Sequence, residues 1–148
     1  MRDDEFDEWV PRMCASYADD LVRHGGVVPE RAQAKAANDL ERLFPDGRRL
    51  PEHSVFVIEV EGRPVGDLWL AERAGELHNG LWVYDVRIDD GERGRGYGRA
   101  AMVFAEEEAR RRGLESVGLM VFGGNDVARR LYRALGYVEN AVYMSKRV

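Results

Sequence analysis

The sequence predicts a mixed α/β (α+β) fold of two helices, an antiparallel meander of three strands, and then a strand–helix–strand crossover. Three observations support it. Apolar residues recur at three- and four-residue steps through the first 45 positions, as they do in amphipathic helices. Three runs rich in β-branched and aromatic residues follow, joined by short connections, as in a meander. A glycine-rich loop then leads into a second helical region around one more strand, and such a parallel crossover should be right-handed.

Two helices are expected first. The apolar stripe of the first helix consists of Phe6, Trp9, Met13, Tyr17 and Leu21. Pro11 interrupts the stripe, so the helix is expected to begin there, with proline in its first turn, or to kink there. Residues 24–26 (HGG) end it. The second helix follows Pro29 and ends near residues 45–47 (PDG), with Ala32, Ala36, Leu40 and Leu43 on one face.

The three strands of the meander are expected at residues 54–60, 63–72 and 80–88. Each run alternates or is dominated by residues that favour strands. A tight hairpin at residues 61–63 joins the first two strands, and a longer turn at residues 73–80 precedes the third.

The last third of the chain predicts two further helices and two strands. A helix over residues 98–113 has the inner stripe Tyr97, Ala101, Phe104 and Ala105 and ends at Gly113. Glu106, Glu107 and Glu108 each precede an arginine by four residues, which suits pairing on an exposed face. A strand at 114–122 follows, then a helix at 123–136, capped by Asn125, ended by Gly136, and with Val127, Leu131 and Leu135 inside. Residues 141–148 are expected to form a closing strand.

Length and composition restrict the function classes. The 148 residues fit one domain over residues 1–148, and a net charge of −5 disfavours a nucleic-acid partner. No apolar run approaches the roughly 18 residues that cross a membrane, and the acidic N-terminus is unlike a signal peptide. One cysteine (Cys14) and three scattered histidines predict neither a disulfide nor a metal site, and they favour a cytoplasmic location.

The loop between the third strand and the next helix predicts an anion site. Gly94, Gly96 and Gly98 let the backbone approach a ligand closely, and the helix N-terminus supplies free amides and a positive dipole end. The P-loop pattern is missing, and a Rossmann pattern fails because Arg99 follows the third glycine and no acidic residue ends the next strand. An RNA-binding interpretation of RGRGYG conflicts with the acidic net charge.

Two motifs resemble the GNAT superfamily of N-acetyltransferases. Arg93, Gly96 and Gly98 spell Arg-x-x-Gly-x-Gly, which is similar to the pyrophosphate-binding signature of that family. The family's downstream segment is matched by Asn125, Ala128, Leu131, Tyr132, Leu135, Gly136 and Tyr137. The resemblance covers residues 56–148 in pattern and 86–137 with more specificity. It implies the GNAT-like acyl-CoA fold, in which the central strand splays away from its parallel neighbour.

The resemblance also implies roles for particular residues. The segment Val86, Arg87 and Ile88 would hold the pantetheine arm and polarise the thioester carbonyl. The pyrophosphate would rest on Arg93, Gly94, Arg95, Gly96, Tyr97 and Gly98, with Arg99 near the helix N-terminus. Asn125 would contact the cofactor, and Tyr132 would bind beside it and protonate the departing CoA thiolate. A phenol of pKa about 10 protonates a thiolate of conjugate-acid pKa about 8.5 only in direct contact. The alternative for Tyr132 is aromatic packing beside Leu131.

No general base is evident. Trp82 and Met120 stand where some family members carry a catalytic acid residue, and neither can accept a proton. Asp85 is the nearest carboxylate on the central strand, and regular alternation puts it on the opposite face from Trp82, so a structural role stays open beside a catalytic one. Flanking loops offer Glu72, Glu76, His78 and His53. A water chain would also serve, and Trp69, Trp82 and Tyr84 would either pack in the core or form a wall for a cationic amine.

The resemblance therefore implies an N-acetyltransferase that moves an acetyl group from acetyl-CoA to a primary amine by direct attack, without a metal. The acceptor would be a small-molecule or peptide amine of unidentified structure, and the natural acyl group and a homodimer are left open. The alternative is a non-catalytic acyl-CoA-binding sensor module, which the missing base favours. A third hypothesis is a binding domain for another phosphate ligand that uses only the helix N-terminus.

Overall fold

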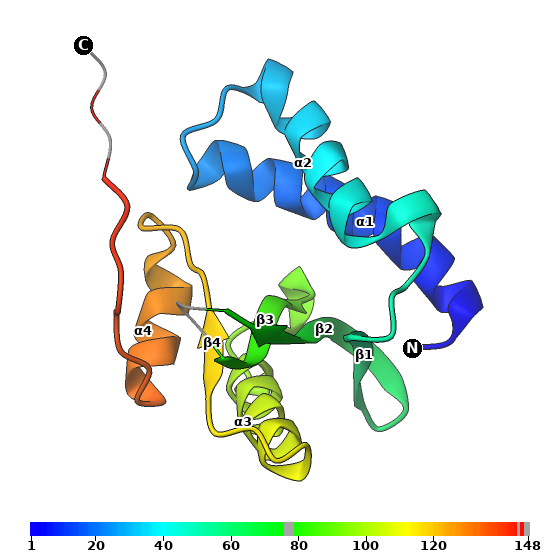
Figure 1. Cartoon of the computed structure of the whole chain (residues 1–148), viewed down its shortest axis with the longest axis vertical. Helices are drawn as coiled ribbons and strands as arrows, with labels where there is room; N and C mark the ends of the chain where they lie inside the picture. Colours follow the sequence, from blue (N-terminus) through cyan, green and yellow to red (C-terminus); the bar gives the residue numbers. More distant parts are fainter. Residues whose placement is uncertain (76–78, 145, 147–148) are drawn as a thin grey trace.

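The computed structural model describes residues 1–75, 79–144 and 146 and contains the predicted order of elements up to the last helix. Helices α1 (Asp3–Arg23) and α2 (Pro29–Leu43) come first, and strands β1 (His53–Val60), β2 (Arg63–Ala74) and β3 (Asn79–Ile88) follow (Figure 1). Helix α3 (Tyr97–Arg111), strand β4 (Val117–Leu119) and helix α4 (Asp126–Ala134) complete the chain, and single 3-10 turns lie at Pro45–Gly47 and Asp90–Glu92. In the described ranges no helix combines the length and apolar character needed to cross a membrane.

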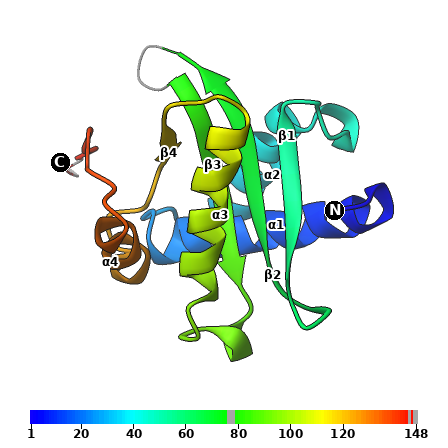
Figure 2. The ribbon, with the colours of Figure 1, turned by 90° about the horizontal axis from the view of Figure 1, so that it is seen from below.

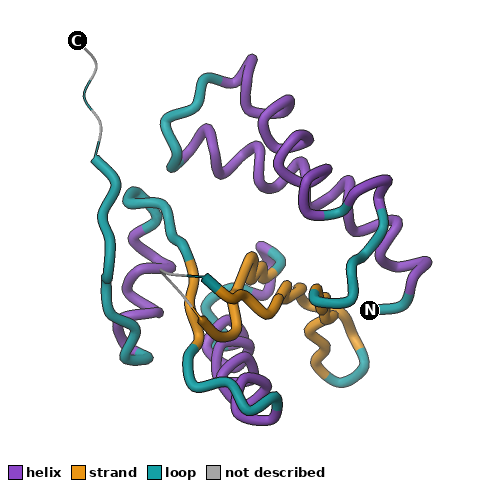
Figure 3. The backbone as a smooth tube through the Cα atoms, viewed as in Figure 1, coloured by secondary structure: helices purple, strands orange, loops and turns teal. Residues whose placement is uncertain are grey.

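The sheet has the strand order β1-β2-β3-β4. The pairs β1–β2 and β2–β3 are antiparallel, and β3–β4 is parallel, which confirms the meander and the crossover. Figure 2 shows α3 on one face of the sheet and α1 and α2 on the other, and Figure 3 traces the same layers by secondary structure. Helix α4 lies beside β4 at the edge of the sheet.

A hydrophobic core lies on each face of the sheet. The α1 and α2 side contains Phe6, Trp9, Met13, Leu40, Phe44, Val55 and Trp69. The α3 side contains Leu68, Leu70, Leu81, Val83, Met102, Ala105 and Ala109. Burial of large apolar side chains at about 25 cal/mol per Å² is the main force that holds these layers together.

Helix α1 begins at Asp3 and runs through Pro11, so the expected start at the proline is wrong. Three acidic residues, Asp3, Asp4 and Glu5, occupy the first turn, where they interact favourably with the helix dipole. Pro11 itself is exposed, and the buried stripe from Phe6 to Leu21 continues past it. Packing of that stripe offsets the one backbone hydrogen bond that a proline removes.

Helix α3 turns a different face inward from the one its pattern predicts. Ala101 and Ala105 are buried as expected, but Met102 and Ala109 are buried with them, while Phe104 is 39% exposed. Glu108 is not on an exposed face either, because it is buried and bonds to Arg111 and Arg112. These two guanidinium groups, Arg111 first, lower the pKa of Glu108 to about 2 against the opposing effect of burial.

Three expectations for the C-terminal part need correction. Strand β4 has three residues, because only these pair with β3. In α4, Leu131 and Leu135 are half-buried, but Val127 is 73% exposed. The closing strand is wrong for its described residues, 141–144 and 146, which form no strand. This segment runs beside α4 and away from the sheet (Figure 1), so it meets no strand edge that could pair with it.

Candidate active site

The sheet opens between β3 and β4. The two strands pair only at Leu81–Val117, Trp82–Gly118 and Val83–Leu119, and β3 then continues to Ile88 while β4 ends. Residues 84–88 of β3 therefore lack a described partner on that side. This opening, which we call the notch, confirms the splayed central strand that the resemblance implied, and it leaves backbone groups of β3 accessible to a ligand.

A β-bulge at Tyr84 determines what faces the notch. On β2, Leu70 pairs with Val83 and Trp69 pairs with Asp85, so Tyr84 is an extra residue on β3. The bulge shifts the alternation of side chains by one. Asp85 consequently shares the α1 face with Trp69 and with Tyr84, whose ring stacks on Trp69. The predicted position of Asp85, opposite to Trp82 and Tyr84, is therefore wrong.

The charge of Asp85 on β3 acts on the phenol of Tyr132 on α4. Burial, followed by the neighbouring carboxylates Asp67 and Asp20, raises the pKa of Asp85 to about 7, against the opposing effect of Arg87. Its Oδ2 atom is buried without a hydrogen-bond partner among the described atoms. Burial and the charge of Asp85 raise the pKa of Tyr132 to about 12. Of the two residues predicted to be catalytic, Asp85 thus lies close enough to Tyr132 for its charge to raise the pKa of that phenol.

A buried polar network fixes the end of β3. Arg87 donates from Nη2 to Asp67 Oδ2 at 2.6 Å and from Nη1 to Asp89 Oδ1 at 2.6 Å. The Asp67 side chain is 4% exposed and accepts a second hydrogen bond from Trp9 Nε1 at 3.0 Å. The Arg87 side chain is therefore occupied by carboxylates. Sequence reasoning missed Asp67 because its partners lie 20 and 58 positions away in the chain.

The glycine loop presents free backbone amides. Gly94 (φ 76°) and Gly96 (φ 86°) lie in the left-handed region, and Gly96 is the N-cap of α3. A Cβ atom at either position would meet nothing within 4 Å, so conformation rather than space requires glycine. Among the described residues no side chain caps α3, so its first amides are available to an anion. A Cβ at Gly98 would lie 3.6 Å from Leu131 and 3.8 Å from Ile88, which places α4 against this loop.

The arginines of the loop differ in how they are used. Arg93 donates from Nε to the Ile88 carbonyl oxygen at 3.0 Å, which fixes the loop to the end of β3. Arg95 pairs with Glu92 at 3.4 Å. Arg99 is exposed and has no ion pair within the part of the chain that the structure describes. Tyr97 is half-buried at the start of α3. Arg95 and Arg99 can therefore add positive charge beside the free amides.

Asn125 and Val86 lie at the borders of the notch. The Asn125 Oδ1 atom accepts a hydrogen bond from the Ala128 backbone amide at 3.2 Å and so caps α4. This bond leaves the side-chain NH₂ of Asn125 available to a ligand. Val86 is half-buried and packs on the α3 side. All the predicted cofactor-binding residues therefore lie on three neighbouring segments, the end of β3, the glycine loop and α4.

The other candidates for proton transfer lie elsewhere. His53 is buried, and its Nδ1 accepts a hydrogen bond from Trp69 Nε1 at 2.9 Å. Burial lowers the pKa of His53. Glu72 bonds to Arg112, and Glu76 and His78 lie outside the described residues. Among the carboxylates of the described residues, Asp85 is the one whose charge raises the pKa of Tyr132. Over residues 1–75, 79–144 and 146 no three metal-binding side chains lie together.

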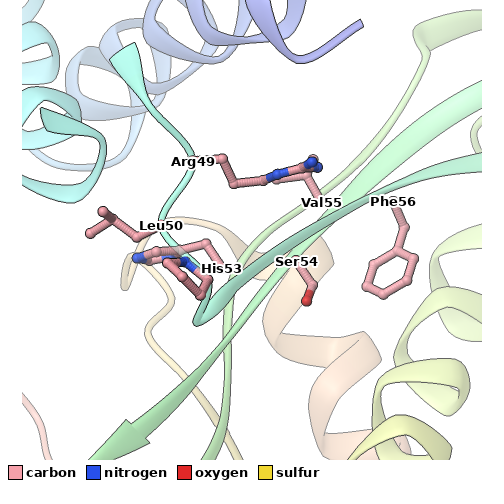
Figure 4. Close-up of a pocket in the computed structure, with 7 residues that line it drawn as sticks. Arg49, Leu50, His53, Ser54, Val55 and Phe56 are labelled. Carbon is pink, nitrogen blue, oxygen red and sulfur yellow. The ribbon is translucent and has the colours of Figure 1, made fainter. Parts of the chain in front are cut away.

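Hollows lie at different places around the sheet. One, of about 440 Å³, lies over β1 and is lined by Arg49, Leu50, Pro51, His53, Ser54, Val55 and Phe56 (Figure 4). Because β1 is the far edge from β4, this hollow is distant from the notch. Another, of about 250 Å³, lies between α1 and the end of β3 and includes Asp20 and Arg87, the neighbours of Asp85.

Comparison with known proteins finds acetyltransferases among the similar sequences and structures. Residues 12–137 match the model of the Acetyltransferase (GNAT) family. The Bacillus subtilis protein named "Uncharacterized N-acetyltransferase YycN" is 30% identical over 149 residues, which is 100% of this chain and 96% of the relative. The crystal structure of YycN superposes with a TM-score of 0.89, covering 100% of this chain and 95% of the other. An aminoglycoside N-acetyltransferase in complex with CoA, 15% identical, matches 76% of this chain and 91% of its own with a TM-score of 0.58.

Proposed function

The chain belongs to the GNAT family of acetyltransferases, and we propose that it moves the acetyl group of acetyl-CoA directly onto a primary amine held at the notch. Membership makes it an acetyl-CoA-dependent N-acetyltransferase. The observation that carries the assignment of residues is the opening between β3 and β4 beside the uncapped start of α3, against which α4 with Tyr132 packs. Residues 1–148 act as one domain in this proposal.

The chain's own residues would hold the coenzyme along the opened strand. The free amides from Arg93 to Gly98 and the N-terminus of α3 would bind the pyrophosphate, with Arg95 and Arg99 adding charge. The unpaired stretch Val86–Ile88 would hold the pantetheine arm. Acetyl-CoA supplies the activated thioester carbonyl, and backbone amides of the same stretch would stabilise the oxyanion that forms there.

Asp85 and Tyr132 would each carry out one of the proton transfers of the reaction. The acceptor's ammonium gives one proton to the Asp85 carboxylate, whose pKa of about 7 suits a base at neutral pH. The free amine nitrogen forms a bond to the carbonyl carbon and loses a second proton to solvent as the C–S bond breaks. Tyr132 gives its proton to the departing thiolate and regains one from solvent. Asp85 then returns its proton to solvent, so the products are an amide, the free thiol of CoA and one proton.

The charge state of Asp85 would couple these two steps. Ionised Asp85 raises the pKa of Tyr132 and so keeps its phenol protonated. Once Asp85 has accepted the amine's proton, that negative charge is gone and the phenol becomes a stronger acid. Tyr132 would therefore become a better donor at the moment when the thiolate leaves.

Release of CoA thiol from acetyl-CoA over a broad panel of primary amines tests this function. Tyr132→Phe is expected to lower kcat by about 100-fold, while the affinity for CoA changes less than about twofold, because only the proton donor is lost. Tyr137→Phe is the matched control, because the ring centroids of Tyr137 and Tyr132 lie 5.9 Å apart. The kcat of this variant should stay near that of the parent.

The alternatives give different results in the same experiments. Unchanged turnover by Tyr132→Phe would remove Tyr132 from the mechanism. A thermal shift with CoA but no thiol release from any amine would support the acyl-CoA-binding sensor module instead. Equal stabilisation by ATP and by CoA would support a general phosphate site at the helix N-terminus.

A further inference from the structure

The hollow of about 250 Å³ beside the notch has two charged walls. One wall is a single face of α1, along which Arg12, Ser16, Asp19, Asp20 and Arg23 lie at helical spacing. The other wall consists of Arg87, Asp90 and Arg93 from the end of β3 and the start of the glycine loop. Both signs of charge are therefore present within one small space.

The two walls differ in how their charges are balanced. On the strand side, Arg87 pairs with Asp67 and Asp89, and Arg93 pairs with Asp90 at 2.8 Å. On the α1 side, Arg12, Asp19, Asp20 and Arg23 make no ion pair or side-chain hydrogen bond with any residue that the structure describes. Asp19 and Arg23 stand four positions apart, a spacing that allows a pair. The α1 wall thus offers groups of both signs that can bind a ligand directly, with Arg23 and Arg93 acting on Asp20 through their charge alone.

The hollow adjoins the acid that the proposed reaction uses. Asp20 and Arg87 both line the hollow, and the charges of both act on Asp85. Asp85 and the hollow lie on the same α1 face of the sheet, because the bulge at Tyr84 turns Asp85 to that side. An amine placed at Asp85 would therefore extend the rest of its molecule into the hollow.

On the basis of the proposed function, we propose that the acceptor is a small zwitterion, an amine that also carries a carboxylate, of the size of an amino acid. Its ammonium group would lie between Asp20 and Asp85, and its carboxylate would meet Arg12 and Arg23. A guanidinium group is well matched to a carboxylate, which it binds with two parallel hydrogen bonds. A hollow of about 250 Å³ accommodates a molecule of that size.

Paired acceptors test this proposal. Thiol release would be measured with the common amino acids and, beside each, the amine that lacks its carboxylate. The amino acid is expected to have at least about tenfold higher kcat/KM, which corresponds to about 1.4 kcal/mol. Equal or better use of the amines without carboxylate would overturn the proposal and leave the N-acetyltransferase function intact. No release from either series, where other primary amines of the broad panel release thiol, would overturn this proposal alone. No release from any amine, despite CoA binding, would overturn both.

Variants of the α1 wall locate the carboxylate. Arg12→Gln and Arg23→Gln, both at exposed positions that tolerate substitution, should raise the KM for the preferred amino acid by about tenfold or more and narrow its advantage over the matching amine. The KM for acetyl-CoA should change less than about twofold. Arg31→Gln, an exposed change on α2 away from the hollow, is the matched control. A rise in the KM for acetyl-CoA alone would assign the hollow to the coenzyme and overturn the proposal.

Discussion

The region up to Ala109 and the region after it are held together in different ways. All the buried side chains that the structure describes lie at or before Ala109. Residues 110–144 contain half-buried side chains and several large exposed apolar ones, namely Met120, Val127, Val138, Val142, Tyr143 and Met144. Yet this second region carries Asn125 and Tyr132. The core thus stabilises one region, whereas the other depends on fewer contacts and on what binds to it.

The largest expected effect on stability comes from comparing two leucines, one in each region. Leu70→Ala, at a fully buried position in the sheet, should lower the free energy of unfolding by about 3–5 kcal/mol. Leu135→Ala, at a half-buried position of α4, should lower it by about 1 kcal/mol, because less surface is withdrawn from water. Urea unfolding without ligand measures both, and equal losses would contradict the comparison.

The next effect concerns Asp85, which lies where the two regions meet. Its pKa is about 7 in the fold against 3.8 ordinarily, so the folded state binds the proton more tightly and stability falls as pH rises from about 4 to about 7. The ionisable groups that interact electrostatically with Asp85 are Asp67 on β2, Asp20 on α1, Arg87 on β3 and Tyr132 on α4. Asp85→Asn should therefore raise the free energy of unfolding by about 1–3 kcal/mol at pH 8 and by little at pH 4.

Asp85→Asn should lower turnover, although it raises stability. The kcat/KM of the parent should rise with pH through about 7 as Asp85 loses its proton, and Asp85→Asn should remove that limb of the profile. Asp7→Asn, an exposed change on α1, should alter neither property. If Asp85→Asn is no more stable than the parent at pH 8, the folded state does not raise the pKa of Asp85.

A smaller effect on stability is expected in the glycine loop. Gly96→Ala must place a side chain at φ 86°, which costs about 1–2 kcal/mol, although no atom lies in its way. The affinity for CoA should fall at least about tenfold, because the amides at the start of α3 would no longer hold their positions. Isothermal calorimetry with CoA and urea unfolding measure the two quantities. Unchanged affinity would detach this loop from the coenzyme.

The smallest effect is expected in the exposed C-terminal segment. Val142→Ser removes an apolar side chain that is 72% exposed, so the free energy of unfolding should change by less than about 0.5 kcal/mol. A loss of more than about 2 kcal/mol would mean that this segment packs against something in solution, and the contrast between the two regions would then be smaller than the structure indicates.

Local sequence patterns predicted the elements but not how they are joined at the site. The apolar period identified α1 and α2, and the glycine loop identified the start of α3, since each depends on neighbouring residues. The bulge at Tyr84 depends on how β2 pairs with β3, and no local pattern encodes it. The sequence therefore named Asp85 and placed it on the wrong face.

Interactions between distant segments were equally hidden. Asp67 bonds to Trp9 and Arg87, and the hollow joins α1 to the end of β3. The closing strand was expected because residues 141–144 favour strands in isolation, whereas strand formation needs an edge to pair with. In the closing segment, the local preference for a strand is overruled by which segments come together in space. The bonds of Asp67 and the hollow also depend on contacts between distant segments.

Hydrogen exchange with and without acetyl-CoA tests the central claim most directly, namely that the loosely held second region and the glycine loop bind the coenzyme together. Backbone amides at residues 93–99 and 120–137 should exchange at least about tenfold more slowly when acetyl-CoA is bound, whereas those of α1 and β1 should change little. Slower exchange confined to α1 and α2, with none in the glycine loop or α4, would contradict the account.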